Sequence, residues 1–117
     1  MNITITTIPK EAMRYEGLGD WQFDENQDLF IQVSDEIQGY NQRALIAFHE
    51  LVEALLCRQR GVLTETVDKF DFTAICGPDD EPGDLPDCPY AKEHRMAMIL
   101  EHLLAHELGL IGYGIVR

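Results

Sequence analysis

Basic side chains are scarce in this sequence. Nine lysines and arginines stand against 21 aspartates and glutamates, which gives a formal net charge of −12. A nucleic-acid or anionic-membrane surface needs lysine and arginine to neutralise phosphate, so the composition argues against both kinds of partner. The excess of acid permits cation binding, solubility or mimicry of a nucleic-acid backbone instead.

Long apolar runs are lacking as well. No stretch approaches the roughly 20 apolar residues of a membrane-spanning helix, and the N-terminus has no basic segment followed by an apolar core. The sequence therefore predicts a cytoplasmic protein. Its 117 residues, 45% of them hydrophobic, suffice for one core, so we expect a single domain over 1–117.

Cysteines are few, and their spacing argues against a disulfide framework. Cys57, Cys76 and Cys88 are odd in number and form no C-x-x-C pair. Reduced thiols are the simplest interpretation, with Cys57 as a small buried side chain. A glycine-rich phosphate loop and a dinucleotide fingerprint are also lacking.

The first third of the chain alternates apolar and polar side chains, which is typical of β-strands with one buried face. The alternation predicts a strand over 2–7, a hairpin or bent strand formed by 13–16 and 21–23, and a further strand over 28–34. We therefore expect a small antiparallel sheet of three to four strands, with Trp21 on its buried face.

Helical spacing dominates the remainder of the chain. It predicts one long helix over about 41–60, capped by Asn41 and closed by Gly61, and a second long helix from Pro89 to Gly109. The expected fold class is α+β, a small antiparallel sheet followed by two long packed α-helices.

Three shorter segments complete the expected architecture. Residues 64–71 read as a short helix, and the apolar tail 110–117 is expected to dock as a final strand or segment. Residues 77–88 combine proline, glycine and acidic side chains, which predicts a solvated surface loop without regular structure. A lid or a second cation site is the alternative for that loop.

The first long helix carries polar side chains on an apolar surface. Its apolar residues spread almost all the way round, as in a buried helix, so His49, Glu50 and Glu53 fall where water is scarce. A carboxylate buried without a partner is costly or shifts its pKa. We therefore expect a metal ion or an acid–base network to compensate.

His49 and Glu53 are four residues apart and share one face of that helix. A helix holds a metal ion with this spacing in H-E-x-x-H, where the intervening glutamate is the general base. Here Glu53 replaces the second histidine, and a carboxylate ligand suits manganese or iron as well as zinc. Glu50 is the expected catalytic base, with a role as a further ligand as the alternative.

The second long helix repeats this pattern. His94 and Glu101 are seven residues apart on its apolar stripe, so packing the two stripes together would bring both residues close to His49 and Glu53. We predict a divalent-metal site formed by His49, Glu53 and His94. Glu101 would be a fourth ligand or an acceptor that orients a histidine.

The segments H-E-L at 49–51 and A-L-L at 54–56 resemble the metal-binding helix of zincin metalloproteases, in particular the small domains of phage and bacterial repressor-cleaving metalloproteases. The resemblance implies a minimal zincin-like fold, zinc as the cofactor and hydrolysis of a protein or peptide. Zincins bind a peptide along an edge strand beside the active helix, a role that 28–34 would fill.

The chain also resembles a type of small phage or prophage protein over roughly its C-terminal two-thirds. The shared features are H-E-L-x-E-A-L-L-C at 49–57, F-D at 70–71, E-P-G-D at 81–84 and P-Y-x-x-E-H at 89–94. This resemblance implies the cytoplasm of a bacterial host cell and carries no assigned activity.

Two other functions stay open. A non-catalytic protein would use its acidic surface to bind a basic host or phage protein, with the polar cluster purely structural. Alternatively, the glutamate-bearing helices would form the magnesium site of a nucleotide pyrophosphohydrolase, although the strand-rich N-terminal third argues against that architecture. The preferred interpretation is a metal-dependent hydrolase.

Overall fold

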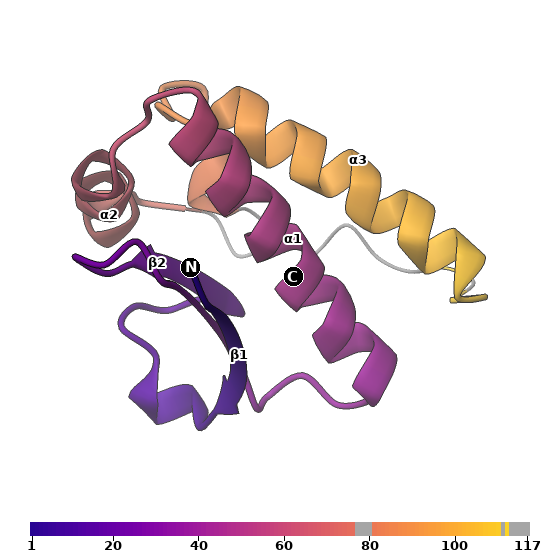
Figure 1. The fold of residues 1–117 in the computed structure, drawn as a ribbon. Helices are drawn as coiled ribbons and strands as arrows, with labels where there is room; N and C mark the ends of the chain where they lie inside the picture. Colours follow the sequence, from indigo (N-terminus) through magenta and orange to yellow (C-terminus); the bar gives the residue numbers. More distant parts are fainter. Residues whose placement is uncertain (77–80, 111, 113–117) are drawn as a thin grey trace.

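The computed structural model describes residues 1–76, 81–110 and 112. Strands and helices follow one another along the chain in an α+β arrangement, as predicted (Figure 1). The elements are β1 (Ile3–Ile8), the 3-10 turn η1 (Lys10–Ala12), β2 (Gly19–Phe23), β3 (Leu29–Ser34), α1 (Tyr40–Gln59), α2 (Thr64–Thr73), the 3-10 turn η2 (Pro82–Asp84) and α3 (Ala91–Glu107). Three α-helices therefore follow the sheet in the described part of the chain: the two longer ones, and α2, which confirms the short helix predicted over 64–71.

The sheet is mixed, so the expectation of an antiparallel sheet is wrong. Its strand order is β1-β3-β2, and the central strand β3 pairs with β1 in parallel and with β2 in an antiparallel register. β1 and β3 can pair in parallel because the chain between them is long enough to return to the end of the sheet at which β1 begins. This connection includes η1 and β2.

Residues 13–16 form an irregular connection, so the predicted strand there is wrong. This connection is held by side-chain hydrogen bonds and not by backbone pairing with a neighbouring strand. The Arg14 guanidinium donates to Asp20 at 2.7 and 2.8 Å and to Asp68 of α2 at 3.1 Å. The Tyr15 hydroxyl donates to the Gly19 carbonyl oxygen at 3.0 Å. The hairpin of the sheet is instead the one between β2 and β3.

The core lies between α1 and one face of the sheet. Ile5 of β1 and Ile31 of β3 are partners in register on that face. Ile31 is fully buried, whereas Ile5 is 54% exposed, because α1 packs over β2 and β3 and leaves β1 at the margin. Trp21 and Cys57 are buried, as predicted, and Cys57 is a free thiol.

The two long helices begin and end close to the predicted positions. Gly39, with φ of 88°, is the residue before α1, so the predicted cap at Asn41 is wrong. Gly61 follows α1 in the expected left-handed conformation, with φ of 73°. α3 begins at Ala91, two residues after the predicted start at Pro89.

α1 and α3 pack against each other (Figure 1). Within the described residues, every helix falls short of the length and apolar character that a membrane crossing needs.

The predicted loop over 77–88 contains η2, and its residues 77–80 lie outside the described part of the chain. The prediction for the tail concerns residues that, except for 110 and 112, also lie outside it.

Because α1 packs over β3 and leaves β1 at the margin, the same substitution should affect stability differently in the two strands. Ile31→Ala should lower the free energy of unfolding by about 2–5 kcal/mol, because it opens a cavity beneath α1. Its register partner provides the matched control, and Ile5→Ala should cost about 1 kcal/mol or less. Urea unfolding with unchanged m-values measures both. Equal losses would contradict the marginal position of β1.

Candidate metal centre

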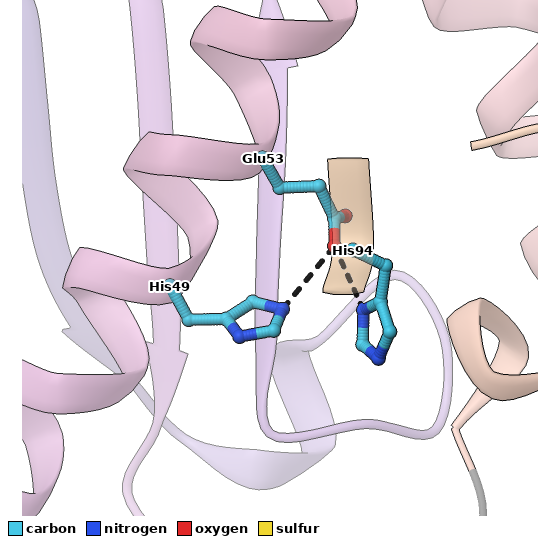
Figure 2. A group of neighbouring side chains, drawn as sticks. All are labelled: His49, Glu53 and His94. Carbon is cyan, nitrogen blue, oxygen red and sulfur yellow. Dashed lines mark hydrogen bonds and ion pairs between the residues drawn. The ribbon is translucent and has the colours of Figure 1, made fainter. Parts of the chain in front are cut away.

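Two helices bring one carboxylate and two imidazoles to a common point. His49 and Glu53 come from α1 and His94 from α3, and their exposed fractions are 0%, 5% and 3%. One potential ligand atom from each residue lies within 4.8 Å of the other two. Figure 2 shows the Glu53 carboxylate between the two rings. The structure therefore brings together three of the four predicted ligands in an arrangement that could bind a metal ion.

A single oxygen of Glu53 meets both rings. Oε2 lies 3.2 Å from His49 Nε2 and 3.0 Å from His94 Nδ1 (Figure 2). When nitrogen and oxygen ligands surround a zinc ion tetrahedrally at about 2.0–2.1 Å, neighbouring ligand atoms stand roughly 3.3 Å apart. The observed spacings are therefore close to those of a ligand shell.

The second nitrogen of each ring also faces a carboxylate. His49 Nδ1 lies 2.8 Å from Glu101 Oε1, and His94 Nε2 lies 3.0 Å from Asp84 Oδ1. Glu101 is thus on the far side of the His49 ring from Glu53, and it is 1% exposed. This position favours the orienting role over direct ligation, the two roles that the sequence leaves open for Glu101.

These contacts require a proton or a metal ion between each ring and Glu53. A neutral imidazole has one N–H, and if that N–H donates to Glu101 or Asp84, the other nitrogen points a lone pair at the Glu53 oxygen. Two acceptors at about 3 Å repel each other unless a proton or a cation lies between them. The cluster is therefore satisfied by imidazolium rings, by a carboxyl proton that replaces a ring proton, or by a bound metal ion.

The pKa values of Glu53 and His94 are shifted in the directions that these contacts predict. Burial by itself would raise the pKa of Glu53, but hydrogen bonds and charge from His49 and His94 outweigh it and lower this pKa to about 2. Burial by itself would lower the pKa of His94, but Glu53 above all, with Glu81 and Asp84, raises it. The field of the carboxylates thus favours positive charge at the rings.

The sheet contributes to the site through one side chain. The Trp21 indole, on β2, donates from Nε1 to Glu53 Oε1 at 3.0 Å. This hydrogen bond occupies one carboxylate oxygen and leaves Oε2 directed between the two rings. Trp21 was predicted as a core residue, and this second role was not anticipated from the sequence.

The turn η2 lies directly on the His94 ring. A Cβ added at Gly83 would stand 2.3 Å from His94 Cγ, so this position has no room for a side chain. Reciprocal hydrogen bonds between Glu81 and Asp84 close the turn and present Asp84 to the ring. The expectation of a solvated loop without regular structure is therefore wrong at η2, and sequence reasoning missed both Gly83 and Asp84.

A cleft of about 880 Å³ opens onto the site, and Glu50, Glu53 and His94 are among its lining residues. Glu50, the predicted base, is 6% exposed and lies against the first residue of β2, where a Cβ at Gly19 would come within 2.9 Å of its Oε1. Glu50 therefore shares the cleft with two of the candidate ligands.

The peptide-binding role expected for 28–34 does not fit the observed sheet. β3 occupies this segment and is the central strand, with β1 on one side and β2 on the other. Its backbone groups are already paired, so a peptide cannot extend the sheet there.

Comparison of the chain with models of protein families, with curated proteins and with solved structures finds no match.

The two pKa shifts predict an optimum of stability in metal-free protein. Glu53 has a lowered pKa, so its contribution is full above the ordinary value of 4.5 and is lost as pH falls towards about 2. His94 has a raised pKa, so its contribution is full below 6.5 and is lost as pH rises through the raised value. With chelator present, unfolding experiments should give maximal stability between these limits.

A matched variant isolates the upper side of this profile. His94→Gln keeps a polar side chain of similar reach but removes the titrating group, so the loss of stability above pH 6.5 should become smaller. A wild-type profile in chelator that stays flat from pH 6 to 9 would contradict the proposed charge balance.

Proposed function

We propose that this protein binds a divalent metal ion through His49 Nε2, His94 Nδ1 and Glu53, and that it is a metal-dependent hydrolase of peptide bonds. The observation that carries the proposal is the approach of one buried Glu53 oxygen to imidazole nitrogens of two different helices, at 3.2 and 3.0 Å. A divalent ion supplies the positive charge that this arrangement requires.

Zinc is the metal that we propose first. Two imidazole nitrogens and one glutamate form a donor set of catalytic zinc sites, which keep a further position for water or substrate. Manganese and iron(II) accept the same donors and are the alternatives. Magnesium prefers oxygen ligands and retains most of its water, so the mixed donor set speaks against the nucleotide pyrophosphohydrolase.

Two further carboxylates would support the ligands. With a metal ion on the opposite nitrogens, Glu101 would accept from His49 Nδ1 and Asp84 from His94 Nε2, which would fix the tautomer of each ring. A carboxylate behind a histidine ligand also raises the basicity of that ligand. The same pairing on both rings supports a metal site more strongly than one such pair would.

The proposed reaction is hydrolysis in the cleft beside Glu50. When bound, a divalent ion polarises a carbonyl oxygen and lowers the pKa of a coordinated water towards neutrality. The Glu50 carboxylate takes a proton from the attacking water as the new C–O bond forms, and delivers it to the amine nitrogen as the C–N bond breaks. The cleft volume of about 880 Å³ is in the range of ligand sites.

The resemblance of the α1 motif to the zincin helix supports this choice of reaction. The proposed place of action is a bacterial host cell that carries the phage or prophage, as implied by the resemblance over 49–94.

Metal content tests the site directly. Protein purified without a metal-affinity tag should contain about one zinc, manganese or iron ion per chain, and His49→Ala and His94→Ala should lose it. His106→Ala is the matched control on α3, because His106 is exposed and outside the cluster. Elemental analysis measures the content, with circular dichroism to verify folding.

The fluorescence of Trp21 provides a second readout. Trp21 is the one tryptophan of the chain and donates to Glu53, so metal addition to chelator-treated protein should change its emission. Wild-type protein that takes up none of the three metals and shows no change in emission would overturn the metal site.

Glu50→Gln tests the proposed base. It should lower kcat by about 10²–10⁴-fold, because glutamine cannot take a proton, while metal content stays unchanged. The assay follows new amino termini in a pool of unstructured peptides, with Glu107→Gln as an exposed control on α3. Equal turnover by wild type and Glu50→Gln would exclude Glu50 as the base.

A further inference from the structure

We infer that the cleft selects positively charged substrates, so that lysine- and arginine-bearing peptide segments are the substrate class of this site. The inference rests on the proposed function, since it names the substrate of the same site.

Acidic side chains dominate the cleft. Among the described residues that line it, six carboxylates accompany one lysine, one arginine and the imidazole of His94. The carboxylates belong to Glu16, Glu36, Glu50, Glu53, Asp71 and Glu81, and the lysine and arginine are Lys10 and Arg14. A concave surface of one sign concentrates its field, so this cleft attracts cations and repels anions.

The lysine and the arginine are themselves paired with carboxylates. Arg14 donates to Asp20 at 2.7 and 2.8 Å and to Asp68 at 3.1 Å, so two carboxylates surround one guanidinium. The Lys10 ammonium lies 3.4 Å from Glu36. An acidic or phosphorylated substrate would therefore have to displace an existing ion pair to reach either cation.

The acidic character persists when a divalent ion is counted. Glu53 as ligand and Glu50 as base offset its two positive charges, and Glu16 and Glu81 are then still present in the cleft, together with Asp71, whose pKa burial raises to about 7. Asp71 accepts a hydrogen bond from the Tyr90 hydroxyl, which fixes this carboxylate in the wall. The negative charge of this lining attracts a basic group of a substrate whose scissile bond lies at the metal site.

Apolar side chains beside these acids suit the stems of lysine and arginine. Phe72 is 52% exposed and Ile75 is 92% exposed, and both line the cleft. Phe72 also stacks edge-on with the Tyr15 ring, at 5.8 Å between centroids. The Arg14 guanidinium already lies 5.5 Å from the Phe72 ring centroid, so this ring accepts a cation over its face. An aliphatic stem can pack here with its charged end towards a carboxylate.

The experiment compares two peptide libraries that differ in charge alone. Both are decapeptides randomised over uncharged residues and labelled with the same uncharged dye, one with two fixed lysines and the other with two fixed glutamates. Binding to zinc-loaded Glu50→Gln is measured by fluorescence anisotropy, and cleavage by zinc-loaded wild type is measured in parallel. We expect at least about tenfold tighter binding and faster cleavage of the lysine library at low ionic strength, declining with added salt.

A charge-reversal variant tests whether the preference for the lysine library arises in the cleft. Glu16→Lys, at an exposed position of the lining, should reduce the preference by roughly twofold to fivefold. Glu107→Lys makes the same change of net charge at an exposed site outside the lining and should leave the preference unchanged. Equal effects of the two variants would assign the preference to net charge and overturn the cleft as its source.

The two measurements separate this inference from the proposed function. Cleavage of both libraries at equal rates would overturn the inference and leave the hydrolase intact. Tight binding of the lysine library to metal-loaded protein without any cleavage would overturn the hydrolase and support the inference. Binding of neither library would overturn the inference.

Discussion

The helices and the sheet of this protein meet at the contact of Glu53 Oε2 with two imidazoles. His49 reaches it from α1, His94 reaches it from α3, and Trp21 fixes the other oxygen from the sheet. Three layers therefore meet at one buried carboxylate. Such an arrangement is stable only if positive charge is supplied between its members, because the desolvation of unpaired charges is costly. Because positive charge is needed beside Glu53, this buried site is also suitable for a metal ion.

Much of the helical part could be predicted from the sequence because its signals are local. The apolar periodicity and Gly61 predict the extent of α1, and the polar residues on two apolar stripes predict that His49, Glu53 and His94 approach one another. The sheet was predicted less well. Alternation identifies a strand and its buried face but not its neighbour or direction, and those depend on how the chain between strands returns. Arg14 illustrates the limit, since its segment alternates like a strand but its side chain bonds to Asp20 and Asp68.

The support of the site was harder to predict than its centre. Asp84 and Gly83 belong to a segment whose composition is typical of solvated loops, and nothing in that composition indicates a buried histidine beneath it. Composition averages over a segment, whereas the role of Gly83 follows from one close approach in three dimensions. Glu101 differs because its position on the apolar stripe of α3 marks it as unusual. A polar residue is therefore recognisable when its surroundings are apolar and easily overlooked when they are polar.

The contact between Glu53 and His94 also joins positions 41 residues apart, so it closes a loop that includes α2 and η2. In polymer terms a metal ion held there is a reversible crosslink. A covalent crosslink over a loop of this length removes unfolded-state entropy equivalent to about 4 kcal/mol, and an ion that stays bound to both helices constrains the chain in the same way. The availability of metal would then affect the stability of the whole fold, so that chelation would act as reduction does on a disulfide-bonded protein.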